Sequence, residues 1–426
     1  MTDLALLGGT KTIVQPFAKY SSIGREEVEA AKAVVESGVL SRFHGSWDAD
    51  FYGGDKVRGF EHDWSAFFGV QHAVTVNSNT SGLIAAAGAI GIEPGDEVIV
   101  SPWTMSASAT AILVWNAIPV FADIEDETFN LDPASIENSI TPYTRAIMVP
   151  DIFGHAADMD AIMDIARKHK LKVIEDCAQA PAARYRGRYA GTIADIGVYS
   201  LNYHKHIHTG EGGVCVTNDP VLAERIQLIR NHAEAVVGDK GVADLSNMIG
   251  FNFRMTEIEA AIGIEQLKKL KGLTAARMSQ AARLNAGIRD LCGLRTPVVK
   301  PDCSHVYYVY PLVYDSEKTG VPRDLMVKAL RAEGVPASAQ YMNVHLFPMY
   351  QNKIAYGKSG FPWSAPFYRG AVSYAKGICP VAEGLNDRRY IGMSMCLYDY
   401  TEQDIDLIVS AFHKVWGSLG RLKELS

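Results

Sequence analysis

The sequence has no Cys-x-x-Cys pair, no long run of one charge sign and no apolar stretch long enough to cross a membrane. Its six cysteines are scattered along 426 residues, which argues against a disulfide framework or a cysteine zinc site and favours reduced thiols in a cytoplasm. The best apolar stretches, such as GLIAAAGAIGI, fall well short of the ~20 residues that a membrane span needs. The first residues, MTDLALLGGTK, have only a brief apolar run, so we expect no signal peptide.

The charge and composition are those of an ordinary globular protein. A formal net charge of -7 is spread over acidic and basic residues, so neither nucleic acid nor a membrane surface is an expected partner. Hydrophobic residues make up 48% and charged residues 21% of the chain. The length allows one large or two medium domains. We therefore expect a soluble, cytoplasmic protein.

From about residue 73 onward, short apolar runs alternate with helical stretches. The runs are rich in Val and Ile and mostly continuous, as expected for strands whose two faces are both covered by helices. Repeated strand-helix-strand units predict an α/β fold with a mainly parallel sheet. The expected strands are AVTVNS, EVIVSP, IPVFADI, TRAIMVPDIFG, LKVIEDCAQA, DIGVYSLN and GGVCVTND.

The pattern changes after RMTEIEAAIGIEQLKKL. A long helical stretch runs toward residue 290, and less regular α+β patterning follows. We place a domain boundary near residue 270, which gives a large domain over residues 1–270, with the N-terminal segment, and a small C-terminal domain over 271–426. The stretch FHGSWDADFYGGDK (43–56), rich in Gly and aromatic residues, is predicted to be a loop rather than core.

Two strands end in polar residues, and ligands of an open parallel sheet gather at such ends. VNSNTSGL (76–83) opens a helix whose first N–H groups and hydroxyls could bind an anion, although for this segment alone ordinary capping by Ser78, Asn79 or Thr80 is the better explanation. In VIEDCAQA (173–180), Asp176 could anchor a cationic ring nitrogen or could cap a helix. Glu175 is adjacent to Asp176, so a strand directs the two side chains to opposite faces.

SLNYHKHIHTGEGG (200–213) places one lysine among three histidines. Lys205 could form a Schiff base with an aldehyde cofactor, with Ser200 on its phosphate, or could be a solvated surface charge. His204, His206 and His208 alternate, so a strand would align them as for a metal, but no Asp, Glu or Cys occurs nearby at ligand spacing. TGEGG lacks the Gly-Lys-Ser/Thr ending of a nucleotide-binding P-loop.

A fourth segment, GFNFRMTEIEAAIG (250–263), forms a polar hook before a helix. Asn252 or Arg254 could reach a phosphate, or could hydrogen-bond the turn that starts the helix. Together and in this order, the four segments and SPWTMSASAT resemble the fold-type-I sugar aminotransferases of the DegT/DnrJ/StrS family, which use pyridoxal 5′-phosphate (PLP). The resemblance runs from about residue 20 to beyond 350.

The resemblance implies a large domain with a mainly parallel seven-stranded sheet between helices, a smaller C-terminal α+β domain, and a homodimer whose active sites are shared between subunits. It implies that Lys205 forms the internal aldimine with PLP and that Asp176 pairs with the pyridine nitrogen. The other residues that it assigns are Gln179 at the ring hydroxyl, Asn79, Thr80 and Ser200 around the phosphate, Asn252 reaching the phosphate of the other subunit, and His345, Tyr341 and His206 on the substrate side. It implies no metal.

Two features depart from the family pattern. The family usually stacks an aromatic ring on the cofactor just after the Thr of the P-x-x-T segment, but Met105 stands there and Trp103 precedes the threonine, so either side chain could stack. The stretch 43–56 is long and is expected to reshape the substrate entrance.

The implied reaction is amino-group transfer in amino-sugar biosynthesis. L-Glutamate or L-glutamine would convert PLP to pyridoxamine phosphate, which would aminate a keto group of a sugar, nucleotide-sugar, sugar acid or cyclitol. A PLP-dependent sugar dehydratase or deoxygenase of the same fold is the nearest rival function, but those relatives have histidine where Lys205 stands. Two more functions stay open: a catalytically silent regulatory protein on the same scaffold, and a metal hydrolase that uses the histidine trio.

Overall fold

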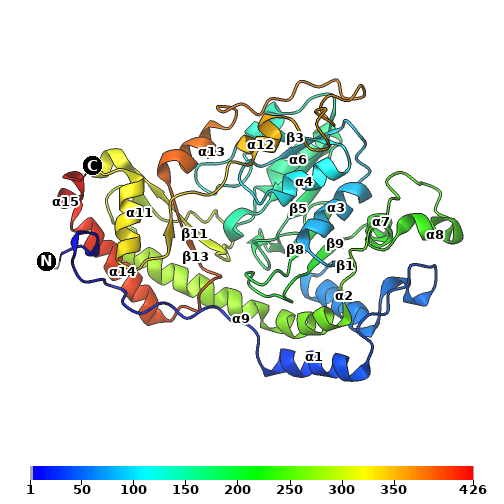
Figure 1. Cartoon of the computed structure of the whole chain (residues 1–426), viewed down its shortest axis with the longest axis horizontal. Coiled ribbons are helices and arrows are strands. Elements are labelled where there is room, and N and C mark those ends of the chain that lie inside the picture. The colour runs from blue at the N-terminus through cyan, green and yellow to red at the C-terminus, as the bar shows by residue number, and fades with distance from the viewer. Residues whose placement is uncertain (1–2, 426) are drawn as a thin grey trace.

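A seven-stranded sheet lies at the centre of the larger part of the molecule (Figure 1), which a computed structural model describes over residues 3–425. The strand order is β1-β9-β8-β5-β4-β2-β3, and every neighbouring pair is parallel except those that involve β9. The strands are β1 (His72–Val76), β2 (Glu97–Val100), β3 (Ile118–Phe121), β4 (Thr144–Pro150), β5 (Lys172–Asp176), β8 (Ile196–Ser200) and β9 (Gly213–Thr217). The predicted mainly parallel α/β sheet is confirmed.

Helices cover both faces of this sheet and produce two separate cores. They include α2 (Asp55–Phe68), α3 (Asn79–Ala89), α4 (Ala107–Val114), α5 (Pro133–Asn138), α6 (Met159–His169), α7 (Pro220–Arg230) and α8 (Ala233–Lys240), whereas α1 (Arg25–Ser37) packs against the long helix α9 (Glu257–Ile288). Small residues let α3 lie close to the sheet, because a Cβ at Gly82 would come within 2.6 Å of Val198 Cγ1. The close approach brings the first turn of α3 to the carboxyl end of the neighbouring strands.

The helix α9 (Glu257–Ile288) runs from the large sheet to a second, four-stranded antiparallel sheet (Figure 1). Thr256 starts it with a capping box, since its hydroxyl accepts from Glu259 N–H while the Glu259 carboxylate accepts from Thr256 N–H. The second sheet contains β10 (Leu294–Arg295), β11 (Val309–Tyr314), β13 (Tyr390–Ser394) and β12 (Ala337–Ser338) in that order. The boundary predicted near residue 270 falls inside α9, so the chain passes between the two sheets as one continuous helix.

The helices α11 (Arg323–Ala332) and α14 (Glu402–Trp416) pack with the second sheet in a third core. Smaller elements complete the described chain: α10 (Ser316–Thr319), α12 (Pro348–Gln351), α13 (Pro380–Gly384), α15 (Leu419–Lys423), the hairpin β6 (Arg184–Tyr185) and β7 (Arg188–Tyr189), the 3₁₀ turns η1 (Ala5–Leu7), η2 (Ala49–Tyr52), η3 (Ile152–Gly154) and η4 (Val344–Leu346), and the π-helical turn η5 (Leu385–Arg389). No helix within residues 3–425 is both long and apolar enough to span a membrane.

Residues 341–389 return from the second sheet to the large one, where α12 packs on β3 and the start of α13 lies at the end of that strand (Figure 1). Tyr374 Oη donates to the carbonyl of Pro119, at a distance of 2.8 Å. The Asp123 carboxylate accepts from the N–H groups of Val381 and Ala382 at the start of α13. The C-terminal part of the sequence is thus divided between the two sheets.

The stretch 43–56 is not the open loop that its composition predicted. It contains η2, and α2 begins at Asp55. Phe51 is fully buried in a core of the large sheet, and Phe43 is 9% exposed. Its aromatic residues therefore stabilise the fold, which the prediction missed because Gly-rich flanks hid a short buried turn.

Candidate active site

A pocket of about 170 Å³ opens where β4, β5 and β8 end and α3 begins. Seven of the residues predicted from the sequence line it: Asn79, Thr80, Met105, Asp176, Gln179, Ser200 and Lys205. The other lining residues are Ser78, Thr104, Ala107, Pro150, Asp151, Ile152, Ala178, Asn202, His204 and Glu211. The position agrees with the expectation that ligands of such sheets bind at the carboxyl ends of the strands.

Asp176, the last residue of β5, offers the pocket a buried carboxylate. Ser108 Oγ donates to its Oδ2 at 2.7 Å, and Asn79 Nδ2 and Ala178 N–H donate to its Oδ1 at 3.3 and 3.2 Å. Burial raises the pKa of Asp176, while these hydrogen bonds and the charge of Lys205 oppose the rise. The ionised carboxylate therefore has donors in place, and a cation beside it would favour ionisation further.

Lys205 lies in the turn after β8 and is 7% exposed. Burial lowers the pKa of its amine to about 8, although Asp176 and Cys396 act in the opposite direction. Within residues 3–425 the amine has no hydrogen-bond partner, and its Nζ lies 4.3 Å from the centre of the Tyr308 ring. An amine of this kind is suited to react with a carbonyl group near neutral pH.

The first turn of α3 supplies donors for an anion. Ser78 caps the helix through its hydroxyl, which accepts from Ser81 N–H at 3.0 Å. The N–H groups of Asn79 and Thr80 lie in the first turn, where a helix provides no intrahelical acceptor. Ser200 adds a hydroxyl from the end of β8, across the same pocket. A dianionic phosphate matches this donor set.

Gln179 connects the pocket to the substrate-side stretch. Its Oε1 accepts from Phe153 N–H at 2.8 Å, and its Nε2 lies 3.2 Å from Tyr341 Oη. Tyr341 is not among the lining residues, but it contacts the pocket through this hydrogen bond. Gln179 thus lies between the pocket and Tyr341, and Tyr341 can orient Gln179 without lining the pocket itself.

The structure distinguishes the two candidates for a side chain stacked on a cofactor. Trp103 is fully buried, stacks on Phe129, and donates from Nε1 to Asn343 Oδ1 at 2.8 Å. Met105 lines the pocket and is 57% exposed. Trp103 is therefore part of the support that holds the 341–389 segment, and Met105 is the side chain that faces the pocket.

Two predicted substrate-side histidines do not line the pocket. His345 is fully buried, with Nε2 at 3.0 Å from Glu383 Oε1. His206 is also fully buried, with Nε2 at 2.9 Å from the carbonyl of Val306, and burial lowers its pKa to about 3. The two side chains turn into the interior because each has an acceptor there. His208 Nδ1 accepts from Gly210 N–H and His204 Nδ1 lies 2.9 Å from Tyr308 Oη, so one nitrogen of each histidine in the trio has a different partner.

Asn252 is exposed and lies outside the pocket of its own chain. Its Oδ1 accepts from Arg254 Nε at 2.7 Å, and its carbonyl accepts from Asn77 Nδ2. The side chain is therefore fixed on the surface beside the strand that ends at the first turn of α3.

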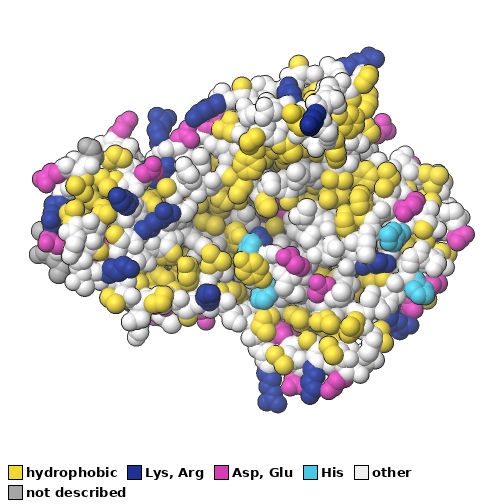
Figure 2. All heavy atoms as spheres, viewed as in Figure 1, with side chains coloured by type: hydrophobic (Ala, Val, Ile, Leu, Met, Phe, Trp, Pro, Cys, Tyr) yellow, Lys and Arg dark blue, Asp and Glu magenta, His cyan; other side chains and the backbone are white. Residues whose placement is uncertain are grey.

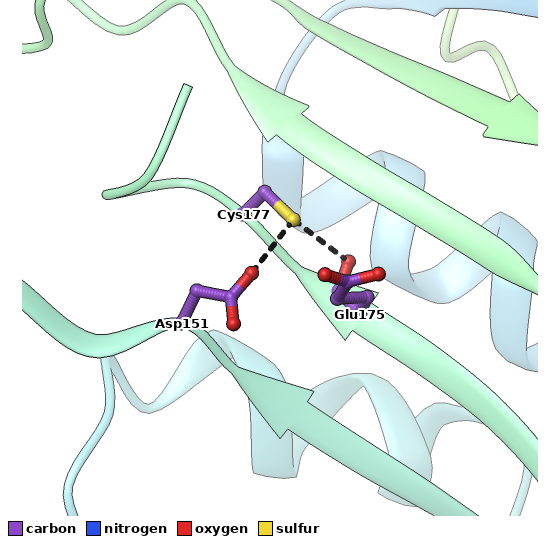
Figure 3. Close-up of side chains that lie close together, drawn as sticks. All are labelled: Asp151, Glu175 and Cys177. Carbon is purple, nitrogen blue, oxygen red and sulfur yellow. Dashed lines mark hydrogen bonds between the residues drawn. The ribbon is translucent and has the colours of Figure 1, made fainter. Parts of the chain in front are cut away.

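Behind the pocket, Asp151, Glu175 and Cys177 form a buried cluster (Figure 3). Their ligand-capable atoms lie within 4.8 Å of one another, and this is the only such group of three among residues 3–425. The Cys177 thiol donates to Asp151 Oδ2 at 3.1 Å, and Ala157 N–H donates to Asp151 Oδ1. Burial raises the pKa of both carboxyls, and the charge of Glu175 raises that of Asp151 further. We expect the pair to share one proton, since two adjacent buried carboxylates do not both ionise at low cost.

The alternation along β5 explains why the neighbours Glu175 and Asp176 have different surroundings. Asp176 faces the pocket, whereas Glu175 Oε2 accepts from the backbone N–H groups of Ile193 and Ala194 at 3.4 Å. The sequence predicted this division. It did not predict Ser108, which reaches Asp176 from α4, or Tyr308, which reaches Lys205 from the start of β11, because both contacts depend on the packing of distant segments.

Residues 23–378 match the sequence model of the DegT/DnrJ/EryC1/StrS aminotransferase family. Over 436 residues, the chain is 32% identical to an L-glutamine:2-deoxy-scyllo-inosose aminotransferase of Streptoalloteichus tenebrarius, with 99% of each chain covered. It is 35% identical over 360 residues to a GDP-perosamine synthase of Caulobacter vibrioides, which covers 84% of this chain and 89% of that one. The solved structure of S. venezuelae DesV in complex with a ketimine intermediate has 30% sequence identity and a TM-score of 0.76, and covers 92% of this chain and 94% of that one.

Proposed function

Since this chain belongs to the DegT/DnrJ/EryC1/StrS aminotransferase family, we propose that it binds PLP and transfers an amino group from an amino acid to a keto group of a sugar or cyclitol. The observation that carries the proposal is the convergence in one pocket of a buried lysine, a buried carboxylate and the open first turn of a helix. These are the groups that a pyridine aldehyde with a phosphate needs.

The donors and acceptors of the pocket fit PLP. Asn79, Thr80 and Ser200 would hold its phosphate, Asp176 its ring nitrogen and Gln179 its ring hydroxyl. Met105 would contact the ring face, since a thioether packs well on an aromatic surface. When bound, PLP supplies an electron sink for cleavage of the Cα–H bond of an amino acid.

The residues of the chain supply the proton chemistry. The ionised Asp176 would keep a proton on the ring nitrogen, because Ser108, Asn79 and Ala178 N–H stabilise its negative charge. Lys205, with its pKa lowered to about 8 by burial, would take the proton from the amino-acid Cα and later return it as general base and acid. The low exposure of both groups limits the access of water to this transfer.

The acceptor that we favour is a ketone without a diphosphate, such as a keto-cyclitol. Lys205 is the only Lys or Arg among the lining residues, whereas Asp176 and Glu211 contribute carboxylates. A nucleotide diphosphate is usually bound by cationic side chains. The similarity to the scyllo-inosose aminotransferase, which extends over 99% of both chains, and the donor in that enzyme's name support a cyclitol ketone with L-glutamine as donor.

A homodimer would complete this site. Hydrophobic side chains gather across the middle of one face (Figure 2). Met105 at the pocket, Tyr203 and Ile249 are also large apolar side chains with high exposure, at 57, 64 and 65%. Exposed apolar patches of this kind often mark subunit interfaces. Asn252 is exposed, and in the homodimer it would reach the phosphate in the pocket of the other subunit.

The test is an amination assay on purified protein with PLP. We expect L-glutamine and a keto-cyclitol to give an amino-cyclitol by mass spectrometry, and Lys205→Ala to give none. Amination only of nucleotide-linked keto sugars would contradict the choice of acceptor. Loss of a hydroxyl without gain of nitrogen would instead identify a dehydratase, and no product from any ketone would contradict the proposed function.

A further inference from the structure

The amine of Lys205 is placed by an aromatic ring from a distant segment. Tyr308 directly precedes β11, and its ring centre lies 4.3 Å from Lys205 Nζ. The backbone of Tyr308 is fixed on both sides, since its N–H donates to the carbonyl of Phe153 at 2.8 Å and its carbonyl accepts from Met395 N–H at 3.2 Å. The ring therefore approaches the amine from a rigid position where the two sheets meet.

A hydrogen bond holds this ring in place. Tyr308 Oη lies 2.9 Å from Nδ1 of His204, the residue before Lys205. Burial raises the pKa of Tyr308, so its hydroxyl keeps its proton and donates to the imidazole. Burial and the charge of Lys205 lower the pKa of His204, which leaves a neutral ring as acceptor. The hydrogen bond thus joins His204, which neighbours Lys205 in sequence, to Tyr308, whose ring neighbours the Lys205 amine in space.

We propose that Tyr308 and His204 are positioning residues for Lys205: the Tyr308 ring, held by His204, fixes the location of the amine and stabilises its protonated form. The inference deepens the proposed function and rests on it for its catalytic meaning. Neither side chain is explained by the cofactor contacts above. A ring face attracts an ammonium group, and the attraction grows when the group is desolvated, as Lys205 is.

Other groups also act on this amine, and the test must separate them from the pair. Asp176 and Cys396 favour its protonated form, and the charge of Lys205 helps to lower the pKa of the neighbouring His206. Glu211 acts on His204 rather than on the amine. All four groups remain unchanged in variants of Tyr308 and His204, so a difference between variants reports on the pair.

The first measurement uses cofactor-free protein and does not depend on the proposed function. Lysines are labelled with ¹³C-methyl groups, and the Lys205 signal is assigned by its loss in Lys205→Arg. We expect the Tyr308→Leu variant to titrate about 0.5–1.5 pH units below the wild type, because the cation–π attraction is lost. Tyr308→Phe keeps the ring face and should shift less.

The controls address folding and the hydrogen bond. Tyr310→Phe removes a hydroxyl two residues further along the chain, in β11, where Tyr310 bonds to Asn285, and should leave the titration unchanged. His204→Ala should shift it in the same direction as Tyr308→Leu, and His204→Gln, which keeps an acceptor, should restore part of the difference. A folded Tyr308→Leu protein that titrates with or above the wild type overturns the proposal.

The second measurement connects the pair to cofactor capture. The rate at which PLP forms a visible absorption band is followed against pH, and its inflection should move with the amine pKa in each variant. If the wild type forms no band at any pH, the proposed function fails while the titration still tests the positioning role. A shifted titration with an unshifted capture rate would contradict the role in capture.

Discussion

Removing the hydroxyl of Ser108 tests how the protein maintains the charge of Asp176. Ser108 Oγ donates to Asp176 Oδ2 at 2.7 Å, and both residues are buried. In Ser108→Ala, alanine keeps the helical propensity of α4 while the shortest hydrogen bond to the carboxylate disappears. The pKa of Asp176, already raised by burial, must then rise further.

The consequence for PLP binding depends on pH, with a sign that follows from this shift. Bound PLP requires the ionised carboxylate, whereas the cofactor-free protein can protonate it. At high pH the carboxylate is ionised before and after binding, so Ser108→Ala and the wild type should bind equally well. As the pH falls, the variant must ionise a weaker acid, and its affinity should fall behind by up to about 1.5–3 kcal/mol, or roughly 10- to 150-fold.

The assay is the dissociation constant of PLP for cofactor-free protein, measured for both proteins across a pH series. The ratio of the two constants cancels the titration of the cofactor itself. Ser410→Ala is the control, since it removes a serine hydroxyl from α14, where it donates to the carbonyl of Asp406. A ratio that stays constant with pH, or that grows as the pH rises, would refute the reasoning.

Three further predictions concern single side chains. Lys205→Ala should bind PLP without the visible band and should have no aminotransferase activity; retained turnover would exclude Lys205 as the acid–base group. Trp103→Phe should lower the thermal stability, because the hydrogen bond to the 341–389 segment is lost, with little change in PLP affinity. Met105→Ala should lower the PLP affinity with little change in thermal stability. The reverse pattern in melting and binding measurements would exchange the roles of the two side chains. Glu383→Ala should destabilise the protein by on the order of 3 kcal/mol, because it leaves His345 and the Cys379 N–H buried without their acceptor, and an unchanged denaturant midpoint would contradict this account.

Local pattern was sufficient to predict the residues that the large sheet presents. Each strand that ends at the pocket could be read from a Val- and Ile-rich run followed by small polar residues, and this placed Asn79, Asp176 and Ser200 at one edge. The predicted opposition of Glu175 and Asp176 follows from the two-residue period of a strand and was confirmed.

Contacts between distant segments could not be predicted in this way. His345 lies in a stretch that resembles the substrate-binding segment of the family, yet its side chain points into the interior, where it bonds to Glu383, 38 residues later. Tyr308 meets Lys205 across 103 residues of sequence, and no periodicity indicates that pairing. The antiparallel direction of β9 was also missed, because a buried strand has the same composition in either direction.

The central claim is that Lys205, Asp176 and the first turn of α3 form a working PLP site, and the visible spectrum of the purified protein tests it most directly. The spectrum is recorded after addition of PLP, then after L-glutamine or L-glutamate, and in parallel for Lys205→Ala. We predict a yellow band in the wild type that is shifted from the absorption of free PLP and that the amino donor removes, and no such shift in the variant. A wild-type protein whose spectrum with PLP is that of free PLP alone, or an equal shift in Lys205→Ala, would contradict the account.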